Sequence, residues 1–253
     1  MDMIVDMDDK ALITKIRRYV AEHICDFHEA RLRVLENLKL DNVLKSKNPY
    51  MFKAKNLEKA HDIVSTIVDA FLSSSEETIF GDWMENLAIF ISGEVYGGKK
   101  SSAHGIDLEF DKDGVHYIVS IKSGPNWANS SQLAKMRNDF KAAAKTLRTS
   151  RSNLNVVAVN GICYGRKRNN DQGDYFRYCG QDFWEFVSGE SDLYIEIIEP
   201  LAVDARKRNE EFLIEYDKKI NIFVADFLKK YSRSDGSVDW EKIVRMNSGS
   251  VEK

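Results

Sequence analysis

Two short strand-like stretches on either side of an Asp-Gly pair constrain the fold of this chain more than any other feature. The residues "IDLEF" and "VHYIVSIK", at positions 106–110 and 115–122, are separated by "DKDG". Runs of this kind are typical of β-strands, and an Asp-Gly pair favours the tight turn that joins two antiparallel strands. The sequence therefore predicts a β-hairpin over residues 106–122.

Charged side chains are placed in this hairpin so that they can meet. Alternate residues of a strand share a face, so Asp107 and Glu109 point the same way, as do Ser120 and Lys122. Antiparallel pairing can bring Asp107 and Lys122 to the same end of the hairpin, beside a predicted helix that carries Glu85. The alternative is a surface hairpin with ordinary solvated charges.

The chain before the hairpin is predicted to be mostly helical. Apolar residues recur at helical spacing over 9–40 and 55–72, and Pro49 interrupts the pattern between them. The serines of "SSSEE" indicate a short link, with Ser74 or Ser75 as the N-cap of a further helix. That helix carries the apolar residues of "FGDWMENLAIFIS".

The chain after the hairpin alternates between helical and strand patterns. Residues 131–149 form a basic amphipathic helix, and "NVVAVNGICYG" is an apolar run typical of a strand in the centre of a sheet. A long helix is predicted over 202–231, followed by a loose tail after Asp235. This order predicts an α/β core with a helical appendage.

Composition indicates an ordinary globular protein. Of 253 residues, 43% are hydrophobic and 30% are charged, so the chain can bury a sizeable core. No stretch approaches the roughly 20 apolar residues that cross a bilayer, and the acidic N-terminus differs from a secretory signal. Three cysteines without zinc spacing indicate reduced thiols, so we expect a cytoplasmic protein with no membrane partner.

Charge is distributed unevenly, although the net charge is only -3. Local clusters of charge steer ligands more than the sum does. Basic residues concentrate in the predicted helix and after the apolar strand: Lys135, Arg137, Lys141, Lys145, Arg148, Arg151, Arg166, Lys167 and Arg168. These positions are compatible with nucleic-acid phosphates or with a solvated helix face.

The hairpin end suits phosphodiester hydrolysis. Carboxylates are the ligands that Mg²⁺ prefers, and the ion neutralises phosphate oxygens and activates water. A lysine can orient the water and stabilise charge in the transition state. Asp107, a second carboxylate and Lys122 would supply these functions.

Several segments resemble a known nuclease family. "GIDL" followed by "SIKSG" resembles the PD-(D/E)xK nuclease signature, and "VSIKSGPNWANSSQ", "DYFRYCGQDFWEFVSG" and "LYIEIIEPL" resemble the PmeII family of type II restriction endonucleases. The resemblance implies a restriction-endonuclease-like core, a mixed sheet flanked by helices, within residues 76–201. It also implies Mg²⁺-dependent, sequence-specific hydrolysis of double-stranded DNA.

The same resemblance implies roles for residues of the hairpin. Asp107 corresponds to the first metal ligand, Lys122 to the catalytic lysine, and the Ile121 carbonyl to an additional metal ligand. The family pattern places an acid two residues before the lysine, where this chain has Ser120. Serine brings no charge, so we expect Glu85 from the preceding helix or Glu109 from the strand to complete the metal site and the catalytic set.

The segment after the lysine is predicted to contact DNA. Amide and hydroxyl groups bind phosphates or base edges, and arginine reads guanine. The predicted contacts are Asn126, Asn129, Ser130, Gln132, Lys135, Arg166, Lys167 and Arg168. Helix capping is the alternative role for the asparagines and serines, and core packing is the alternative to DNA stacking for Trp127.

A symmetric DNA site implies a two-fold homodimer. Residues 1–75 and the C-terminal part, 202–253, are then expected to dimerise or to embrace the DNA. A methyltransferase that protects the host is the expected functional partner, although not a subunit. The remaining alternatives are a repair or structure-specific nuclease with the same core, and a DNA-binding module whose catalytic centre has decayed.

Overall fold

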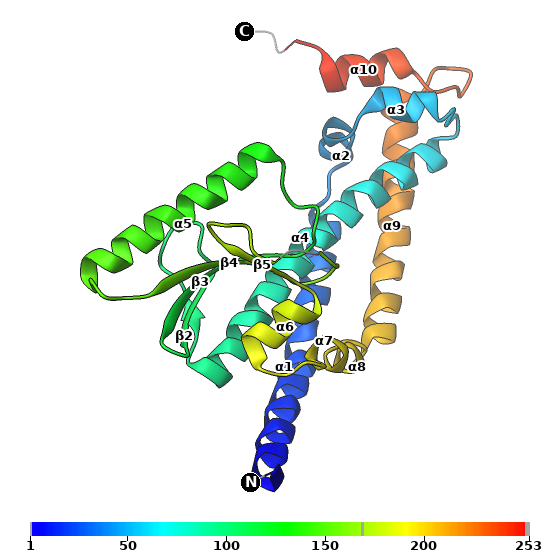
Figure 1. Ribbon diagram of the computed structural model, residues 1–253. Helices are drawn as coiled ribbons and strands as arrows, with labels where there is room; N and C mark the ends of the chain where they lie inside the picture. Colours follow the sequence, from blue (N-terminus) through cyan, green and yellow to red (C-terminus); the bar gives the residue numbers. More distant parts are fainter. Residues whose placement is uncertain (1, 168–169, 251–253) are drawn as a thin grey trace. The chain divides into compact units, whose positions relative to one another are not determined.

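The computed structural model describes residues 2–167 and 170–250, and the side chains of residues 10–167 and 170–250 (Figure 1). Helices make up most of the described residues, and five strands among these residues form one sheet. The helices are α1 (Asp2–Asn37), α2 (Leu40–Ser46), α3 (Pro49–Ala54), α4 (Ala60–Tyr96), α5 (Ser130–Ser150), α6 (Gln181–Ser188), α7 (Leu193–Glu196), α8 (Ile198–Leu201), α9 (Ala205–Tyr231) and α10 (Trp240–Ser248). The strands are β1 (Lys99–Lys100), β2 (Leu108–Lys112), β3 (Val115–Lys122), β4 (Val156–Ile162) and β5 (Phe176–Cys179).

The sheet is mixed and has the strand order β1-β2-β3-β4-β5. β1, β2 and β3 are antiparallel neighbours, whereas β4 runs parallel to both β3 and β5. Helix α5 connects β3 to β4, as a parallel pair requires a crossover. The predicted fold class, an α/β core with a mixed sheet flanked by helices, an N-terminal helical region and a long C-terminal helix, is confirmed.

The predicted hairpin is formed by β2 and β3. Asp113 and Gly114 have φ angles of 53° and 73°. Positive φ at both central residues is the geometry of the two-residue turn that matches the twist of a hairpin, and glycine adopts it without strain. Leu108 pairs with Val119 and Lys112 with Val115, so all of β2 pairs with residues 115–119 of β3.

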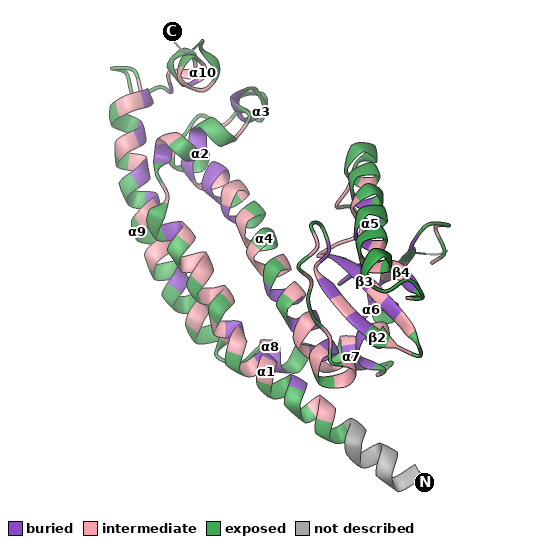
Figure 2. Ribbon diagram, turned by 90° about the vertical axis from the view of Figure 1, so that its left-hand side faces the viewer, coloured by how far each residue is buried: buried purple, intermediate pink, exposed green. Residues whose placement is uncertain are grey.

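Helices cover both faces of the sheet. On one face, Met136 and Phe140 of α5 pack against Ile118 of β3 and Val156 of β4. On the other face, the Phe110 ring stacks on Tyr96 and contacts Phe186 of α6. Figure 2 shows that β3 and β4 are coloured mostly as buried, in agreement with the apolar runs of the sequence.

Gly161 of β4 allows a particularly close approach of α6. A Cβ atom at this position would lie 2.2 Å from Cε2 of Phe183. The Phe183 ring is completely buried. The glycine in "VNGICYG" is therefore required because the ring packs directly on the backbone of the strand.

The chain forms two compact units. One contains residues 1–24 and 80–203, with the sheet, and the other contains residues 25–79 and 204–253. The second unit has its own core, in which residues of α2, α4, α9 and α10 pack together, including Val43, Val64, Phe227 and Ile243. The functional roles predicted for 1–75, 76–201 and 202–253 remain predictions.

Two sequence predictions about the helices were wrong. The serines at 73–75 do not link two helices, because α4 continues through them. The Ser74 hydroxyl donates to the Ala70 carbonyl at 3.0 Å, so its polar group is satisfied inside the helix. The tail after Asp235 is not loose, because it contains α10, whose Ile243 is buried and whose Asn247 donates to the Leu44 carbonyl.

Pro49 begins a helix in addition to interrupting the earlier pattern. It is the first residue of α3, and the Asn48 side chain accepts from the backbone N–H groups of Tyr50 and Met51. Proline fits this position because the first helical N–H has no partner within the helix. Strands β1 and β5 were not predicted. Among the described helices, none is both long enough and apolar enough to cross a membrane.

Candidate active site

Asp107 and Lys122 lie together at the open end of the hairpin. Asp107 immediately precedes β2, and its backbone N–H donates to the Val119 carbonyl at 2.8 Å. Lys122 is the last residue of β3, and its Nζ lies 3.4 Å from Oδ2 of Asp107. The juxtaposition predicted from the sequence is confirmed.

The Lys122 ammonium lies between two oxygen atoms of different kinds. Besides the Asp107 carboxylate, it contacts the Ile121 main-chain carbonyl at 2.7 Å. Oδ2 of Asp107 also accepts from the Ile121 N–H at 2.6 Å and from the Ser120 hydroxyl at 3.4 Å. A carboxylate and a carbonyl oxygen therefore converge on one position that already carries positive charge.

This site is partly shielded from water. The side chains of Asp107 and Lys122 are 21% and 29% exposed. The Lys122 ammonium lies 5.6 Å from the centre of the Trp127 ring, which itself packs against the core beneath α5. Trp127 thus follows the core-packing alternative and also faces the ammonium. Partial exclusion of water strengthens the electrostatic interactions here.

Helix α4 brings Glu85 to the same end of the sheet. One turn before Glu85, a Cβ atom at Gly81 would lie 3.3 Å from Cβ of Ser123, the residue that follows β3. The Glu85 carboxylate is 3.2 Å from Nζ of Lys100 on β1, and its side chain is 21% exposed. Glu85 is therefore a half-buried acid that is paired with an exposed lysine.

The buried thiol of Cys163 links Glu85 and Lys122 electrostatically. The pKa of Cys163 is raised to about 12, mainly by burial and also by the Glu85 carboxylate, whereas the Lys122 ammonium acts to lower it. The backbone N–H of Cys163 donates to the Lys122 carbonyl at 2.9 Å. Both charges act on one thiol, so Glu85 and Lys122 belong to one electrostatic neighbourhood.

Glu109 is engaged elsewhere on the hairpin. Its carboxylate lies 3.3 Å from Nε2 of His116, whose Nδ1 lies 2.8 Å from the Asp111 carboxylate. His116 is buried, and the Glu109 side chain is only 12% exposed. The histidine thus holds Glu109 toward the middle of the hairpin.

The oxygen donors at the strand end are few. Within residues 10–167 and 170–250, no three His, Cys, Asp or Glu side chains gather in a way that could hold a metal ion. Asp107 and the Ile121 carbonyl supply two hard oxygen donors of the kind that Mg²⁺ prefers. The donor types fit this ion, but a second carboxylate has to join them.

Comparison with known proteins decides the family. The family model of the type II restriction endonuclease EcoO109I matches residues 14–209, which include the hairpin, α5 and the rest of the sheet. The chain belongs to the EcoO109I family of type II restriction endonucleases. No curated protein matches the chain. The expectation of a type II restriction endonuclease is supported, whereas the match does not extend to the PmeII family named from the sequence.

In this restriction endonuclease, two amides predicted to contact DNA form a helix cap. The Asn129 side chain accepts from the Gln132 N–H at 3.0 Å, and the Gln132 side chain accepts from the Asn129 N–H at 2.9 Å. This reciprocal arrangement is the capping box that begins α5. The capping alternative therefore holds for Asn129, and the N-cap is not a serine.

The other predicted DNA contacts of the endonuclease are exposed. Asn126, Ser130 and Lys135 lie in the turn after β3 and on the first turns of α5. Arg166 and Lys167 line a cavity of about 590 Å³ beyond the ends of β4 and β5. Arg168 lies outside the described residues.

Asn160 is a polar residue of the site that sequence reasoning missed. It is buried on β4 opposite Ser120, and its Nδ2 donates to the Ser120 carbonyl at 3.1 Å. This bond supports the backbone of β3 immediately before Ile121 and Lys122. An asparagine within the apolar run "NVVAVNGICYG" was the available signal, because a buried amide needs a partner.

Proposed function

We propose that this restriction endonuclease hydrolyses phosphodiester bonds of double-stranded DNA at specific sequences, in a Mg²⁺-dependent reaction at the end of β3. One observation carries the proposal: the Lys122 ammonium lies between the Asp107 carboxylate and the Ile121 carbonyl. Membership in the EcoO109I family supports a nuclease that acts on DNA.

Asp107 and the Ile121 carbonyl are the oxygen donors that would hold Mg²⁺, since both converge on a single cationic position. A bound Mg²⁺ would supply positive charge at the scissile phosphate and increase the acidity of a nearby water molecule. The Ile121 N–H and the Ser120 hydroxyl orient the Asp107 carboxylate, so its geometry is set before any ligand binds.

Lys122 supplies positive charge at the reacting phosphate. Rotation of its flexible side chain moves the ammonium away from the Ile121 carbonyl. This movement frees the carbonyl oxygen and brings Nζ toward the substrate. There the ammonium can hold the attacking water by a hydrogen bond and stabilise negative charge on the phosphate oxygens. The Trp127 ring restricts the directions in which the ammonium can turn.

Glu85 is our choice for the second carboxylate. It lies at the same end of the sheet as Lys122, and among the described residues it forms an ion pair with Lys100, whose side chain is 67% exposed. Exposed ion pairs are weak and easily exchanged. Glu109, in contrast, is held by the buried His116. Glu85 therefore compensates for Ser120, the residue at the usual acidic position, and Glu109 is the second candidate.

Further properties belong to the same proposal. A two-fold homodimer would present one active site to each strand of a symmetric DNA sequence. Asn126, Ser130, Lys135, Arg166 and Lys167 are exposed and would approach the DNA. The protein would act in the cytoplasm, beside a methyltransferase that protects the host sequence.

Incubation of the full-length protein with supercoiled plasmid and Mg²⁺ tests the proposal. Discrete linear fragments support a sequence-specific endonuclease, and chelation of the metal should abolish them. Nicks or a smear would support a repair or structure-specific nuclease instead. A gel shift without cleavage would support a DNA-binding module, the reading that the serine at position 120 favours.

A further inference from the structure

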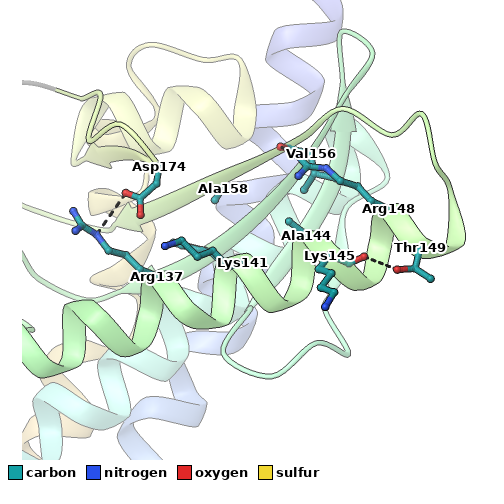
Figure 3. Close-up of a pocket in the computed structure, with 10 residues that line it drawn as sticks. Arg137, Lys141, Ala144, Lys145, Arg148, Thr149, Val156, Ala158 and Asp174 are labelled. Atoms are coloured by element: carbon teal, nitrogen blue, oxygen red, sulfur yellow. Dashed lines mark hydrogen bonds and ion pairs between the residues drawn. The ribbon is translucent and has the colours of Figure 1, made fainter.

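A basic groove lies beside α5, away from the residues assigned above (Figure 3). It has a volume of about 480 Å³ and is bounded by α5, by β4 and by Asp174 in the loop before β5. Its floor is apolar and includes Phe140 and Ala144 of α5 and Ala158 of β4. The groove is therefore a concave surface with an apolar base.

Four cationic residues of one helix line this groove. They are Arg137, Lys141, Lys145 and Arg148. The spacings of four, four and three residues place them along one flank of α5, because residues three or four apart are neighbours on a helix surface. Like charges at these spacings disfavour the helix, so their alignment needs a compensating role.

The cations are only partly neutralised by the protein. Arg137 lies 3.5 Å from the Asp174 carboxylate, and Arg148 donates to the Val156 carbonyl at 3.4 Å. Among the described residues, neither Lys141 nor Lys145 has an acidic partner within ion-pair distance. Figure 3 shows Arg137, Lys141 and Arg148 extending from the helix on the side of β4. The groove thus carries net positive charge over an apolar base.

We propose that this groove binds the sugar-phosphate backbone of DNA; the inference rests on the nuclease function proposed above. Eleven residues of α-helix separate Arg137 from Arg148, which corresponds to roughly 16 Å along the helix axis. This length suits several consecutive phosphates of one strand. Deoxyribose rings would lie on the apolar floor, and phosphates would face the cations.

The position of α5 connects the groove to the active site. The helix begins eight residues after Lys122 and returns along the sheet to the opposite end of β3, where β4 starts. The basic flank therefore runs away from the strand end that holds Asp107 and Lys122. DNA bound in the groove would therefore be held at phosphates away from the scissile one. The residues that hold it differ from those predicted to read the bases.

Lys135 lies on a different side of α5 from the groove. It precedes Arg137 by two residues, which is about 200° of rotation around a helix. The groove therefore separates four of the basic positions noted in the sequence of α5 from Lys135, and the two sides of the helix can be tested separately.

The test measures DNA affinity without cleavage. Fluorescence anisotropy of a short labelled duplex is recorded in the presence of a chelator over a range of salt concentrations. The variant K141Q/R148Q removes two charges from the groove and keeps side chains of similar shape. The control K99Q/K112Q removes two charges from β1 and β2, strands that do not line the groove. Circular dichroism verifies that each variant is folded.

We expect K141Q/R148Q to weaken binding of any duplex sequence about tenfold and to lower the slope of log affinity against log salt by about two. The single variant K141Q should lower the slope by about one. At saturating protein, the cleavage positions should be unchanged. The control should retain the slope of the unmodified protein.

An unchanged slope in both groove variants, with normal cleavage by the unmodified protein, would overturn the groove assignment and leave the nuclease function intact. An equal loss in the K99Q/K112Q control would also overturn it, because net charge alone would then explain the effect. If the unmodified protein neither binds nor cuts DNA, the proposed function itself fails. If the groove variants still bind DNA but no longer bind an acidic polypeptide, the groove is assigned to a protein partner instead.

Discussion

The Lys122 ammonium lies 3.4 Å from the Asp107 carboxylate, although fifteen positions separate the two residues in the chain. The two-residue turn at Asp113 and Gly114 sets the register of β2 and β3, and this register carries both residues to the same end of the hairpin. The contact is therefore a product of the turn as much as of the two side chains.

Replacement of Lys122 by alanine should abolish cleavage and preserve DNA binding. The ammonium supplies charge to the transition state, so we expect a loss of about 100- to 10,000-fold in the cleavage rate. Single-turnover cleavage of plasmid and a gel shift measure the two properties. The control is Lys99→Ala, which removes an exposed lysine from β1. Cleavage by Lys122→Ala at the normal rate would exclude the proposed role.

Replacement of Asp107 by asparagine should weaken metal binding without unfolding the hairpin. The amide oxygen can still accept from the Ile121 N–H, whereas the negative charge that attracts a divalent cation is lost. We expect the Mg²⁺ concentration needed for half-maximal cleavage to rise about tenfold or more. Calorimetric titration with Mg²⁺ provides a second measurement, and unchanged metal affinity would contradict the assignment.

Glu85→Gln and Glu109→Gln should have different effects. Glu85→Gln should impair cleavage and metal binding and leave the melting temperature nearly unchanged, because the pair with Lys100 is exposed. Glu109→Gln should lower the melting temperature, because it removes one of the two carboxylates around the buried His116. The opposite pattern would assign the second metal ligand to Glu109.

Gly161→Ala should destabilise the unit that contains the sheet. The added methyl group would overlap the Phe183 ring, and overpacking of a core costs about 1–3 kcal/mol. Urea denaturation followed by circular dichroism measures the free energy of unfolding. Phe183→Leu in the same protein should recover part of the loss. A neutral effect of Gly161→Ala would show that α6 can move away from β4 freely.

Alkaline pH should destabilise the protein through Tyr231. The pKa of Tyr231 is raised to about 12, first by burial and second by its hydrogen bond to the Asp41 carboxylate. The usual tyrosine pKa is about 10, so the fold favours the protonated phenol. This stabilisation is fully present below about pH 10 and is lost as the pH rises toward 12.

Urea denaturation at several alkaline pH values measures this loss. The variant Tyr231→Phe should show a weaker decline of stability between about pH 10 and 12. Tyr50→Phe, which changes an exposed tyrosine of α3, is the control. Equal pH profiles for the unmodified protein and Tyr231→Phe would show that this phenol does not contribute.

Local sequence determined the parts of the structure that depend on neighbouring residues. The Asp-Gly turn, the strands on either side of it and the amphipathic α5 follow from local propensity and periodicity. Because a hairpin has a two-residue period and a short turn, the meeting of Asp107 and Lys122 was predictable. The continuous α4 was not, because serines at 73–75 are compatible with both a cap and a helix interior.

Only the tertiary structure decided how distant elements complete the site. The pairing of Glu109 with His116, the partnership of Glu85 with Lys100, and the bond from Asn160 to the backbone of β3 depend on strand register and helix packing. Docking of α10 in its own core likewise depends on apolar residues far away in the chain. Sequence spacing describes which residues share a face of one element, whereas the neighbours of that face are selected by packing of the whole chain.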